Sequence, residues 1–283
     1  MKRHSITDEE ISRFCQHLRG EEREPGTIEK YHRDVRAFAA WLQGREVSKE
    51  RVVEWKEHLR MSGYAPVTIN SMLTAANRFF RFLGWDSLRV KALRIQRRMF
   101  RNREKELTRE EYTRLVETAR GLGRERLALL METICATGIR VSEVKYITVE
   151  AAEAGRAEVS LKGKIRTILI PNKLCRKLRK YARKQKNASG EIFLTRSGKG
   201  LSRRQIWAEM KAICAKAGVP AGRVFPHNLR HLFARCFYRA CQDVVQLADV
   251  LGHASVETTR IYLISSGTEH ARCMERLGLV LSF

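Results

Sequence analysis

The segment from Phe225 to Tyr262 constrains the fold more than any other part of the chain, because helix signals follow one another there at short intervals. Pro226 suits the first position of a helix, since its ring presets φ and its missing N–H would be unpaired there anyway. Gly252 stops a second, short helix, and Ser255 caps a third helix that carries Tyr262. We therefore expect three consecutive helices separated by tight turns.

These helices carry four side chains that suit the chemistry of a phosphodiester. His227 and Arg230 lie three residues apart and so share one helix face. His253 follows the short helix, and Tyr262 lies nine residues later. Two imidazoles, a guanidinium and a phenol suit attack on phosphorus. His231 belongs to the same helix as His227, and we expect it to point to another face and to be structural.

The order H-x-x-R, L-G-H and then Tyr262 resembles the signature of the tyrosine recombinase, or phage (lambda) integrase, family, which includes XerC and XerD. A further element lies upstream, where ATGIRVSE (residues 136–143) resembles the first box of that family. Gly138 suits the end of an apolar helix, and Arg140 then begins the next one, where backbone N–H groups favour a phosphate. Glu143, one turn later, is placed to brace Arg140 or its neighbours.

The resemblance implies a role for each of these side chains. Tyr262 is the expected nucleophile, which attacks the DNA phosphate and forms a 3′-phosphotyrosine while a 5′-hydroxyl leaves. Arg140 and Arg230 would clamp the non-bridging oxygens and stabilise the added charge of the transition state. His227 is expected to take the tyrosine proton, and His253 to hydrogen-bond the phosphate.

A small hairpin is expected downstream of the Arg140 box. Residues 156–161 and 166–171 alternate or run apolar as strands do, and KGK forms the turn between them. The resemblance implies a catalytic lysine in this turn, acting as general acid to the leaving 5′ oxygen. Counting from Arg140 favours Lys162, and Lys164 remains possible because the turn is one residue shorter than the common K-G-x-K form.

The charge of the chain indicates a polyanionic partner. Its 283 residues include 55 Lys and Arg against 31 Asp and Glu, a net charge of +24, which would repel itself in isolation. No apolar run approaches the ~20 residues of a membrane-spanning helix, and no signal peptide is visible. We therefore expect a large polyanion rather than a membrane as the partner, and a cytoplasmic location; the resemblance implies that this polyanion is double-stranded DNA.

Metal sites and disulfides are not expected. The seven cysteines are scattered without C-x-x-C pairs, and they suit small buried hydrophobic positions in a reducing compartment. The sequence contains no acidic cluster suited to Mg²⁺. Because a phosphotyrosyl ester keeps the energy of the broken bond, the resemblance implies catalysis without metal, ATP or other cofactors.

The predicted fold is mainly α with a small antiparallel sheet, in two domains. Residues 1–95 show four amphipathic helices, with a capping box at Thr7 and starts at Pro25, Ser48 and Pro66. This bundle resembles the core-binding domain of the family. A basic linker at 96–106, in a strongly basic stretch that begins near residue 89, leads to a catalytic domain at 107–283.

Several cations are candidates for DNA contact. Two of them would oppose the helix dipole in the first turn of a helix expected from Ser202 to Gly218, which suits a helix tip that enters a groove. Phosphate contacts of this kind position a protein without reading sequence, although each such residue could equally belong to a solvated face. The candidates are Lys30, Arg33, Arg78, Arg81, Arg203 and Arg204.

The C-terminal segment, residues 269–283, carries apolar side chains that are unfavourable in water. Leu277, Val280 and Leu281 could form a last core helix or dock on a neighbouring protomer. The resemblance favours docking, and with it a homotetramer on two duplexes that carry inverted-repeat core sites. The leading function is site-specific recombination by integration, excision, inversion or dimer resolution. A type IB topoisomerase-like activity and a non-enzymatic DNA-binding protein are the alternatives.

Overall fold

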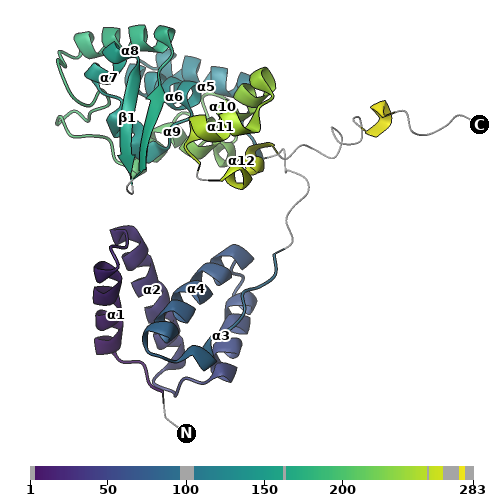
Figure 1. Cartoon of the computed structure of the whole chain (residues 1–283). Coiled ribbons are helices and arrows are strands. Elements are labelled where there is room, and N and C mark those ends of the chain that lie inside the picture. The colour runs from purple at the N-terminus through teal and green to yellow at the C-terminus, as the bar shows by residue number, and fades with distance from the viewer. Residues whose placement is uncertain (1–3, 96–104, 162–163, 254, 264–273, 278–283) are drawn as a thin grey trace, which may run out of the picture. The chain divides into compact units, whose positions relative to one another are not determined.

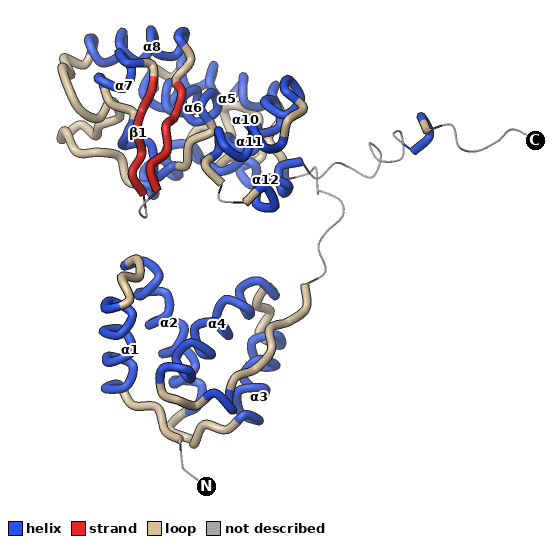
Figure 2. The backbone as a smooth tube through the Cα atoms, in the orientation of Figure 1, coloured by secondary structure: helices blue, strands red, loops and turns tan. Residues whose placement is uncertain are grey.

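The chain is described by a computed structural model of two compact units, residues 1–97 and 98–283 (Figure 1). The structure describes residues 4–95, 105–161, 164–253, 255–263 and 274–277. Most of these residues are helical, and two strands form a small sheet (Figure 2). The expected class, mainly α with a small antiparallel sheet, is confirmed.

The first unit contains four helices whose ends follow the predicted signals. Thr7 closes a capping box with Glu10, Ser48 accepts a hydrogen bond from the amide of Arg51, and proline opens the other two helices. The helices are α1 (Asp8–Gly20), α2 (Pro25–Leu42), α3 (Lys49–Met61) and α4 (Pro66–Phe82), followed by the 3₁₀ turn η1 (Asp86–Leu88).

Aromatic side chains fill the core of this unit. Trp55 of α3 lies 4.7 Å from the Phe38 ring of α2, measured between ring centroids, and Phe80 of α4 packs edge-on against Phe38 at 5.8 Å. These three side chains are almost wholly buried. Large rings at helical spacing thus hold three of the four helices together, as the apolar stripes predicted.

The beginning of the basic stretch after residue 88 is attached to the first unit. The Asn77 side chain exchanges two hydrogen bonds with the backbone of Val90, at 2.9 and 3.0 Å. Asn70 does the same for Leu93, at 2.9 and 2.7 Å. Both asparagines lie on α4, so the residues up to Leu93 pack along this helix. This part of the basic stretch, which lies before the predicted linker, therefore belongs to the first unit.

The second unit carries helices on both sides of its hairpin in sequence. Before the hairpin lie α5 (Arg109–Gly121), α6 (Glu125–Thr137), the 3₁₀ helix η3 (Val141–Tyr146) and α7 (Val149–Ala154). After it come α8 (Asn172–Lys184), α9 (Arg203–Lys211), the 3₁₀ turn η4 (Ala221–Arg223), α10 (Pro226–Cys241), α11 (Val244–Leu251) and α12 (Val256–Leu263).

The hairpin pairs β1 (Arg156–Leu161) with β2 (Lys164–Leu169) in antiparallel register. Arg156 lies opposite Leu169, and Leu161 lies opposite Lys164, so two residues separate the strands. Alternation places Ala157 and Val159 in the core. The second strand begins two residues earlier than predicted. Helix α8 follows at the end of the hairpin away from the connecting residues (Figure 1).

The second unit also holds the residues that precede its first helix. Leu107 is buried, and the Arg235 side chain on α10 donates to its carbonyl at 2.6 Å and to the Glu106 carboxylate. Asn228 donates to the carbonyl of Lys105 at 2.8 Å. Lys105 and Glu106, expected at the end of the linker, are thus fastened to α10, and the remaining linker residues 96–104 lie outside the described residues.

Two further expectations differ from the structure. The helix expected up to Gly218 ends at Lys211 as α9, and the chain continues in turns that still bury Ile213 and Ala217. Of the six described cysteines, Cys236 and Cys241 are exposed rather than buried. In the parts of the chain that the structure describes, no helix is long and apolar enough to cross a membrane.

Candidate functional site

The site begins where α6 ends. Gly138 adopts a left-handed conformation with φ 64°, and its amide donates to the carbonyl of Ile134 at 3.0 Å. Arg140 then precedes η3 with extended backbone angles. Its side chain is 42% exposed, so its guanidinium remains open to a ligand. Gly138 therefore ends one helix and turns Arg140 toward the site, as the first box predicted.

Glu143 is the buried carboxylate of the site. One of its oxygens accepts from the Arg140 amide at 2.7 Å, and the other accepts from Arg140 Nη1 at 2.9 Å. Arg166 Nη2 donates to Glu143 Oε2 at 3.2 Å from strand β2. The expectation that Glu143 braces Arg140 is confirmed by this geometry. One carboxylate therefore orients two guanidinium groups from separate elements.

Arg230, on α10, is 1% exposed and is held by backbone carbonyls. Its Nη1 donates to the carbonyl of Gly138 and its Nη2 donates to the carbonyl of Leu251 at 2.8 Å. These carbonyls lie at the C-terminal ends of α6 and α11, where the helix dipole favours a cation. Arg230 Nη2 also lies 2.9 Å from His253 Nε2. The two helix ends thus position this buried charge.

His253 connects Arg230 to the last described helix of the site. Its Nδ1 lies 2.8 Å from the Oγ1 of Thr259, which is fully buried on α12. The imidazole lies nearly parallel to the Tyr262 ring, with 5.6 Å between centroids and 11° between planes. The Ser255 hydroxyl accepts from the Glu257 amide at 3.2 Å, which is the cap predicted for this helix.

Tyr262 is 3% exposed and lies among the histidines of α10. Its ring centroid is 6.1 Å from that of His227 and 4.5 Å from that of His231. His231 also contacts His227 edge-on at 4.5 Å. The expectation that His231 points to another face was therefore wrong. Residues four apart on an α-helix share a face, and α12 packs against that face.

The electrostatics of the site disfavour further positive charge. Burial, and then the positive charge of Arg230 and Arg140, lowers the pKa of His253 to about 4 and also lowers that of His227. Burial lowers the pKa of Arg166 to about 10, although Glu143 acts in the opposite direction. For Arg230 burial again lowers the pKa, and a hydrogen bond with Tyr262 opposes that shift. Both histidines are therefore neutral at pH 7.

Of the two candidate lysines, the structure describes only the backbone of Lys164. Lys162 lies outside the described residues. Lys164 begins β2 opposite Leu161, and its side chain is not described. Arg166, two residues further along the same strand, lies in the site.

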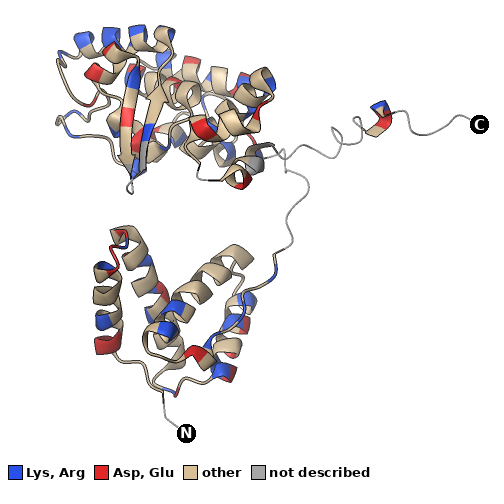
Figure 3. Cartoon of the chain, viewed as in Figure 1, with Lys and Arg blue, Asp and Glu red and all other residues tan. Residues whose placement is uncertain are grey.

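Lys and Arg occur along the helices of both units (Figure 3), and the cations proposed for DNA contact differ in their partners. In the first unit, Lys30 and Arg33 pair with the buried carboxylate of Asp34, and Arg78 pairs with Glu21. Arg81 is exposed. Both arginines of the first turn of α9, Arg203 and Arg204, are exposed as well.

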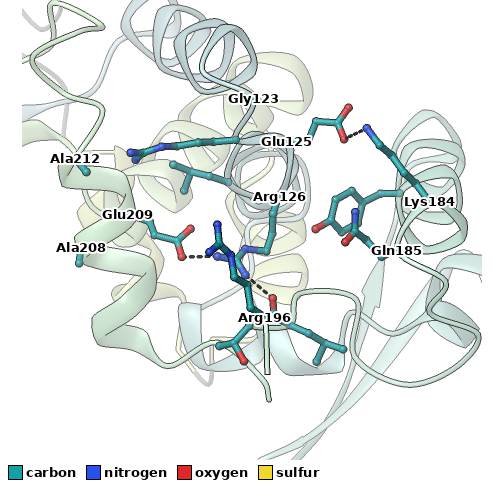
Figure 4. A pocket seen from close by; sticks show the side chains of 14 residues that line it. Gly123, Glu125, Arg126, Lys184, Gln185, Arg196, Ala208, Glu209 and Ala212 are labelled. Carbon is teal, nitrogen blue, oxygen red and sulfur yellow. Dashed lines mark hydrogen bonds and ion pairs between the residues drawn. The ribbon is translucent and has the colours of Figure 1, made fainter. Parts of the chain in front are cut away.

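A hollow of ≈ 750 Å³ elsewhere in the second unit contains none of these site residues. It lies between the start of α6, the end of α8 and α9, and it is crossed by the ion pair of Arg126 with Glu209 at 2.6 Å (Figure 4). Lys184 pairs with Glu125 at its rim at 2.7 Å. Among the described residues, no group of three or more His, Cys, Asp or Glu side chains could hold a metal ion.

Comparison with known proteins decides the family. The sequence profile described as "Phage integrase family" matches residues 105–268, which hold every described residue of the site. A second profile, "Phage integrase, N-terminal SAM-like domain", matches residues 11–87. The chain belongs to the phage integrase family of tyrosine recombinases. Its first unit corresponds to the SAM-like domain and its second to the catalytic domain.

Two relatives align with this recombinase over nearly the whole length of both chains. Tyrosine recombinase XerA of Thermococcus kodakarensis is 30% identical over 96% of the chain and 99% of the relative. Tyrosine recombinase XerC of Roseiflexus castenholzii is 30% identical over 96% of the chain and 95% of the relative. Both expected domains of the recombinase therefore have counterparts in these proteins.

Solved structures share the fold of the recombinase. A lambda integrase tetramer bound to a Holliday junction matches with a TM-score of 0.74 and 17% identity, over 91% of this chain and 77% of the other. XerH bound to its difH substrate matches with a TM-score of 0.67 and 19% identity, over 94% and 84%. At such identities the likeness concerns the arrangement of elements.

Two site residues of the recombinase were missed in the sequence. Arg166 had a local signal, since it lies two residues after Lys164 on a strand whose turn was already a candidate. Thr259 also had one, because it lies one helical turn before Tyr262 and so faces the same side. What the sequence did not show was that Glu143 and His253 are the partners of these two side chains.

We expect Gly252→Ala to destabilise the second unit. Gly252 has φ +63°, which costs an L-residue ~1–2 kcal/mol, and an added Cβ would overlap Arg166 Cδ. The melting temperature, measured by circular dichroism, should fall by ~2–8 °C. Gly121→Ala on α5 is the matched control, because that residue lacks a positive φ and has open space around it. Equal melting temperatures of the two variants would contradict this explanation of the glycine in the L-G-H motif.

Proposed function

We propose that the recombinase breaks and rejoins DNA strands at specific sites through a 3′-phosphotyrosyl intermediate, with Tyr262 as the nucleophile. The observation that carries this proposal is the position of Tyr262, which hydrogen-bonds Arg230 and stacks against His253. A phosphate bound by Arg230 would therefore lie within reach of the phenol. Attack splits one difficult step into two, and the ester keeps the bond energy for rejoining.

The proposed phosphate clamp consists of Arg140 and Arg230. Arg140 is the open member, with its guanidinium fixed by Glu143 and exposed toward solvent. Arg230 is the buried member, and two of its donors already serve backbone carbonyls. Planar guanidinium groups bind phosphate oxygens bidentately and stabilise the charge that develops in the transition state. Arg166 adds a third positive charge behind them.

Proton transfer is assigned to His227 and the hairpin lysine. His227 lies beside the Tyr262 ring, and its lowered pKa leaves it neutral and able to accept the phenol proton. His231 lies closer to that ring and orients His227 through an edge-on contact. Lys162 is the proposed general acid for the 5′ oxygen, because a mobile ammonium suits proton donation. Together with Arg140 and Arg230, this lysine would supply the charge stabilisation that a metal ion gives in many phosphoryl transfers.

The substrate is proposed to be double-stranded DNA with inverted-repeat core sites. The net charge of +24 favours a polyanion, and exposed cations occur in both units, including Arg81, Arg203 and Arg204. The solved relatives include recombinases bound to DNA and a tetramer on a Holliday junction. Relatives named as tyrosine recombinases do not favour a topoisomerase-like or a purely DNA-binding function.

The C-terminal segment, residues 269–283, is proposed to join protomers into a tetramer. Met274 and Leu277 are 70% and 63% exposed, which is unfavourable for apolar side chains unless a partner covers them. Val280 and Leu281 lie outside the described residues. A segment that docks on the next protomer makes a heterologous contact, which closes into a ring and couples the four active sites.

Tyr262→Phe should abolish covalent capture of DNA. A duplex selected from a random-sequence pool for tight binding is synthesised with a nick near the cleavage point, so that the short 5′-hydroxyl strand diffuses away. The unaltered recombinase should then accumulate a protein–DNA adduct on a denaturing gel. The Phe variant should bind the same duplex and form none, because the ring remains and the attacking oxygen is gone. An adduct at normal yield would assign the nucleophile elsewhere.

Lys162→Ala should slow cleavage severely, and Lys164→Ala only mildly, because one lysine protonates the leaving 5′ oxygen. A duplex with sulfur at that position needs little protonation, so it should restore the rate of the true acid variant alone. Single-turnover cleavage of oxygen and sulfur duplexes by both variants measures the difference. Rescue of Lys164→Ala and not of Lys162→Ala would move the acid to Lys164.

Deletion of residues 269–283 should leave a folded protein that binds one site and does not assemble. Unfolding and single-site binding should match the full chain, because the described core lies before this segment. Sedimentation with two duplexes should show the tetramer for the full chain and no tetramer for the deletion. If the shortened protein unfolds, the segment belongs to its own core and the proposed coupling fails.

A further inference from the structure

Thr259 has a buried hydroxyl at the centre of the site, and the proposed cleavage steps do not use it. It lies on α12, three residues before Tyr262, and its Oγ1 is 2.8 Å from His253 Nδ1. Its side chain is fully buried, so water does not compete for this hydrogen bond. The same short helix therefore carries the proposed nucleophile and the partner of His253.

The direction of these hydrogen bonds in the DNA-free protein follows from Arg230. A guanidinium only donates, and Arg230 Nη2 lies 2.9 Å from His253 Nε2, so Nε2 must accept. The ring of His253 is neutral at pH 7, because burial and the neighbouring arginines lower its pKa to about 4. A neutral imidazole has one N–H, which must then be on Nδ1. His253 Nδ1 therefore donates, and the Thr259 hydroxyl accepts.

A bound phosphate would require the proton of His253 to be on Nε2 instead of Nδ1. Phosphate oxygens accept hydrogen bonds, so a neutral His253 can bind one only with its proton on Nε2. Arg230 Nη2, which already serves Leu251 and His253, would then turn its donor from His253 toward the phosphate. Nδ1 of the neutral ring becomes an acceptor and needs a donor. A carbonyl or carboxylate at this position could not donate and would hold the proton on Nδ1.

We propose that Thr259 is a positioning residue for strand cleavage, whose hydroxyl accepts from His253 in the DNA-free protein and donates to it when a DNA phosphate is bound. The His253 ring is only partly buried, so as DNA binds it exchanges protons with solvent: one proton leaves Nδ1 and another reaches Nε2. The ring stays neutral, and no net proton is taken up. This inference rests on the proposed function, since it requires a phosphate at Arg230. A hydroxyl is suited to the task because it can both donate and accept.

The position of Thr259 also ties this hydrogen bond to the nucleophile. Thr259 and Tyr262 lie one turn apart on α12, and the imidazole that Thr259 holds lies nearly parallel to the Tyr262 ring. Docking of α12 thus places the phenol and orients His253 together. Removal of the helix would remove both at once.

The test compares Thr259→Val with Thr259→Ser on the nicked duplex selected as above. Valine keeps the shape and loses the hydroxyl, whereas serine keeps the hydroxyl. Near pH 7.5 we expect Val to reduce single-turnover cleavage by about 10- to 100-fold and Ser to remain near the unaltered rate, with duplex binding unchanged in both. Thermal unfolding of each variant checks that the fold is retained.

The pH profile separates positioning from a structural effect. An imidazolium has N–H groups on both nitrogens, so protonated His253 can donate to phosphate without help from residue 259. The negative charge of the bound phosphate raises the pKa of His253 above its DNA-free value, so the imidazolium becomes more populated as the pH falls. The deficit of the Val variant relative to the unaltered protein should therefore shrink as the pH falls from 8 toward 5. A deficit that is constant with pH, an equal loss in the Ser variant, or no loss in the Val variant would each overturn the proposal.

Nuclear magnetic resonance tests the hydrogen-bond directions directly. With ¹⁵N-labelled histidine, long-range couplings should show His253 as the Nδ1–H tautomer in the DNA-free protein and as Nε2–H with the duplex bound. The Val variant should keep Nδ1–H in both states, and an unchanged tautomer in the unaltered protein would overturn the switch. If Tyr262→Phe still forms an adduct, the proposed function fails instead, whereas the DNA-free tautomer does not depend on cleavage.

Discussion

The site depends on an excess of buried positive charge that one carboxylate does not neutralise. Glu143 is buried and contacts both Arg140 and Arg166, while Arg230 is buried beside them. Burial of a charge without a full partner is costly, and the lowered pKa values of Arg166 and Arg230 express this cost. An arriving phosphodiester supplies the missing negative charge. In the proposed mechanism, DNA binding and the assembly of the cleavage site are thus favoured by the same electrostatic force.

Helix ends make this excess of charge tolerable in the free protein. Arg230 donates to carbonyls at the C-terminal ends of α6 and α11, which carry partial negative charge. Both helices end in a left-handed glycine, Gly138 and Gly252, which turns the chain sharply enough to leave these carbonyls facing the guanidinium. The glycines of the two motifs are therefore part of the arginine site, although neither contributes a side chain.

The sequence predicted what is decided locally. Caps at Thr7, Ser48 and Ser255 and the stop at Gly252 involve residues within one turn, so their spacing alone identified the helix ends. The course of residues 89–93 was missed because it depends on asparagines of α4 that are 13 and 23 residues away in sequence. The motifs likewise pointed to side chains that the structure brings together in the site, and not to the neighbours that orient them. Arg166 reaches Glu143 across 23 residues, and that pairing exists only after the hairpin has folded.

The burial of Tyr262 limits how the site can work. Its side chain belongs to a small apolar cluster with Ala234, Leu247 and Leu251, and α12 holds it there. The phenol is thus buried and contacts Arg230, and it is not exposed to solvent. In the proposed mechanism, a phosphate that reaches Arg230 meets the phenol at the same guanidinium, so binding itself brings the two reactants together. The same contact occupies the arginine until a phosphate arrives, and water is kept from both.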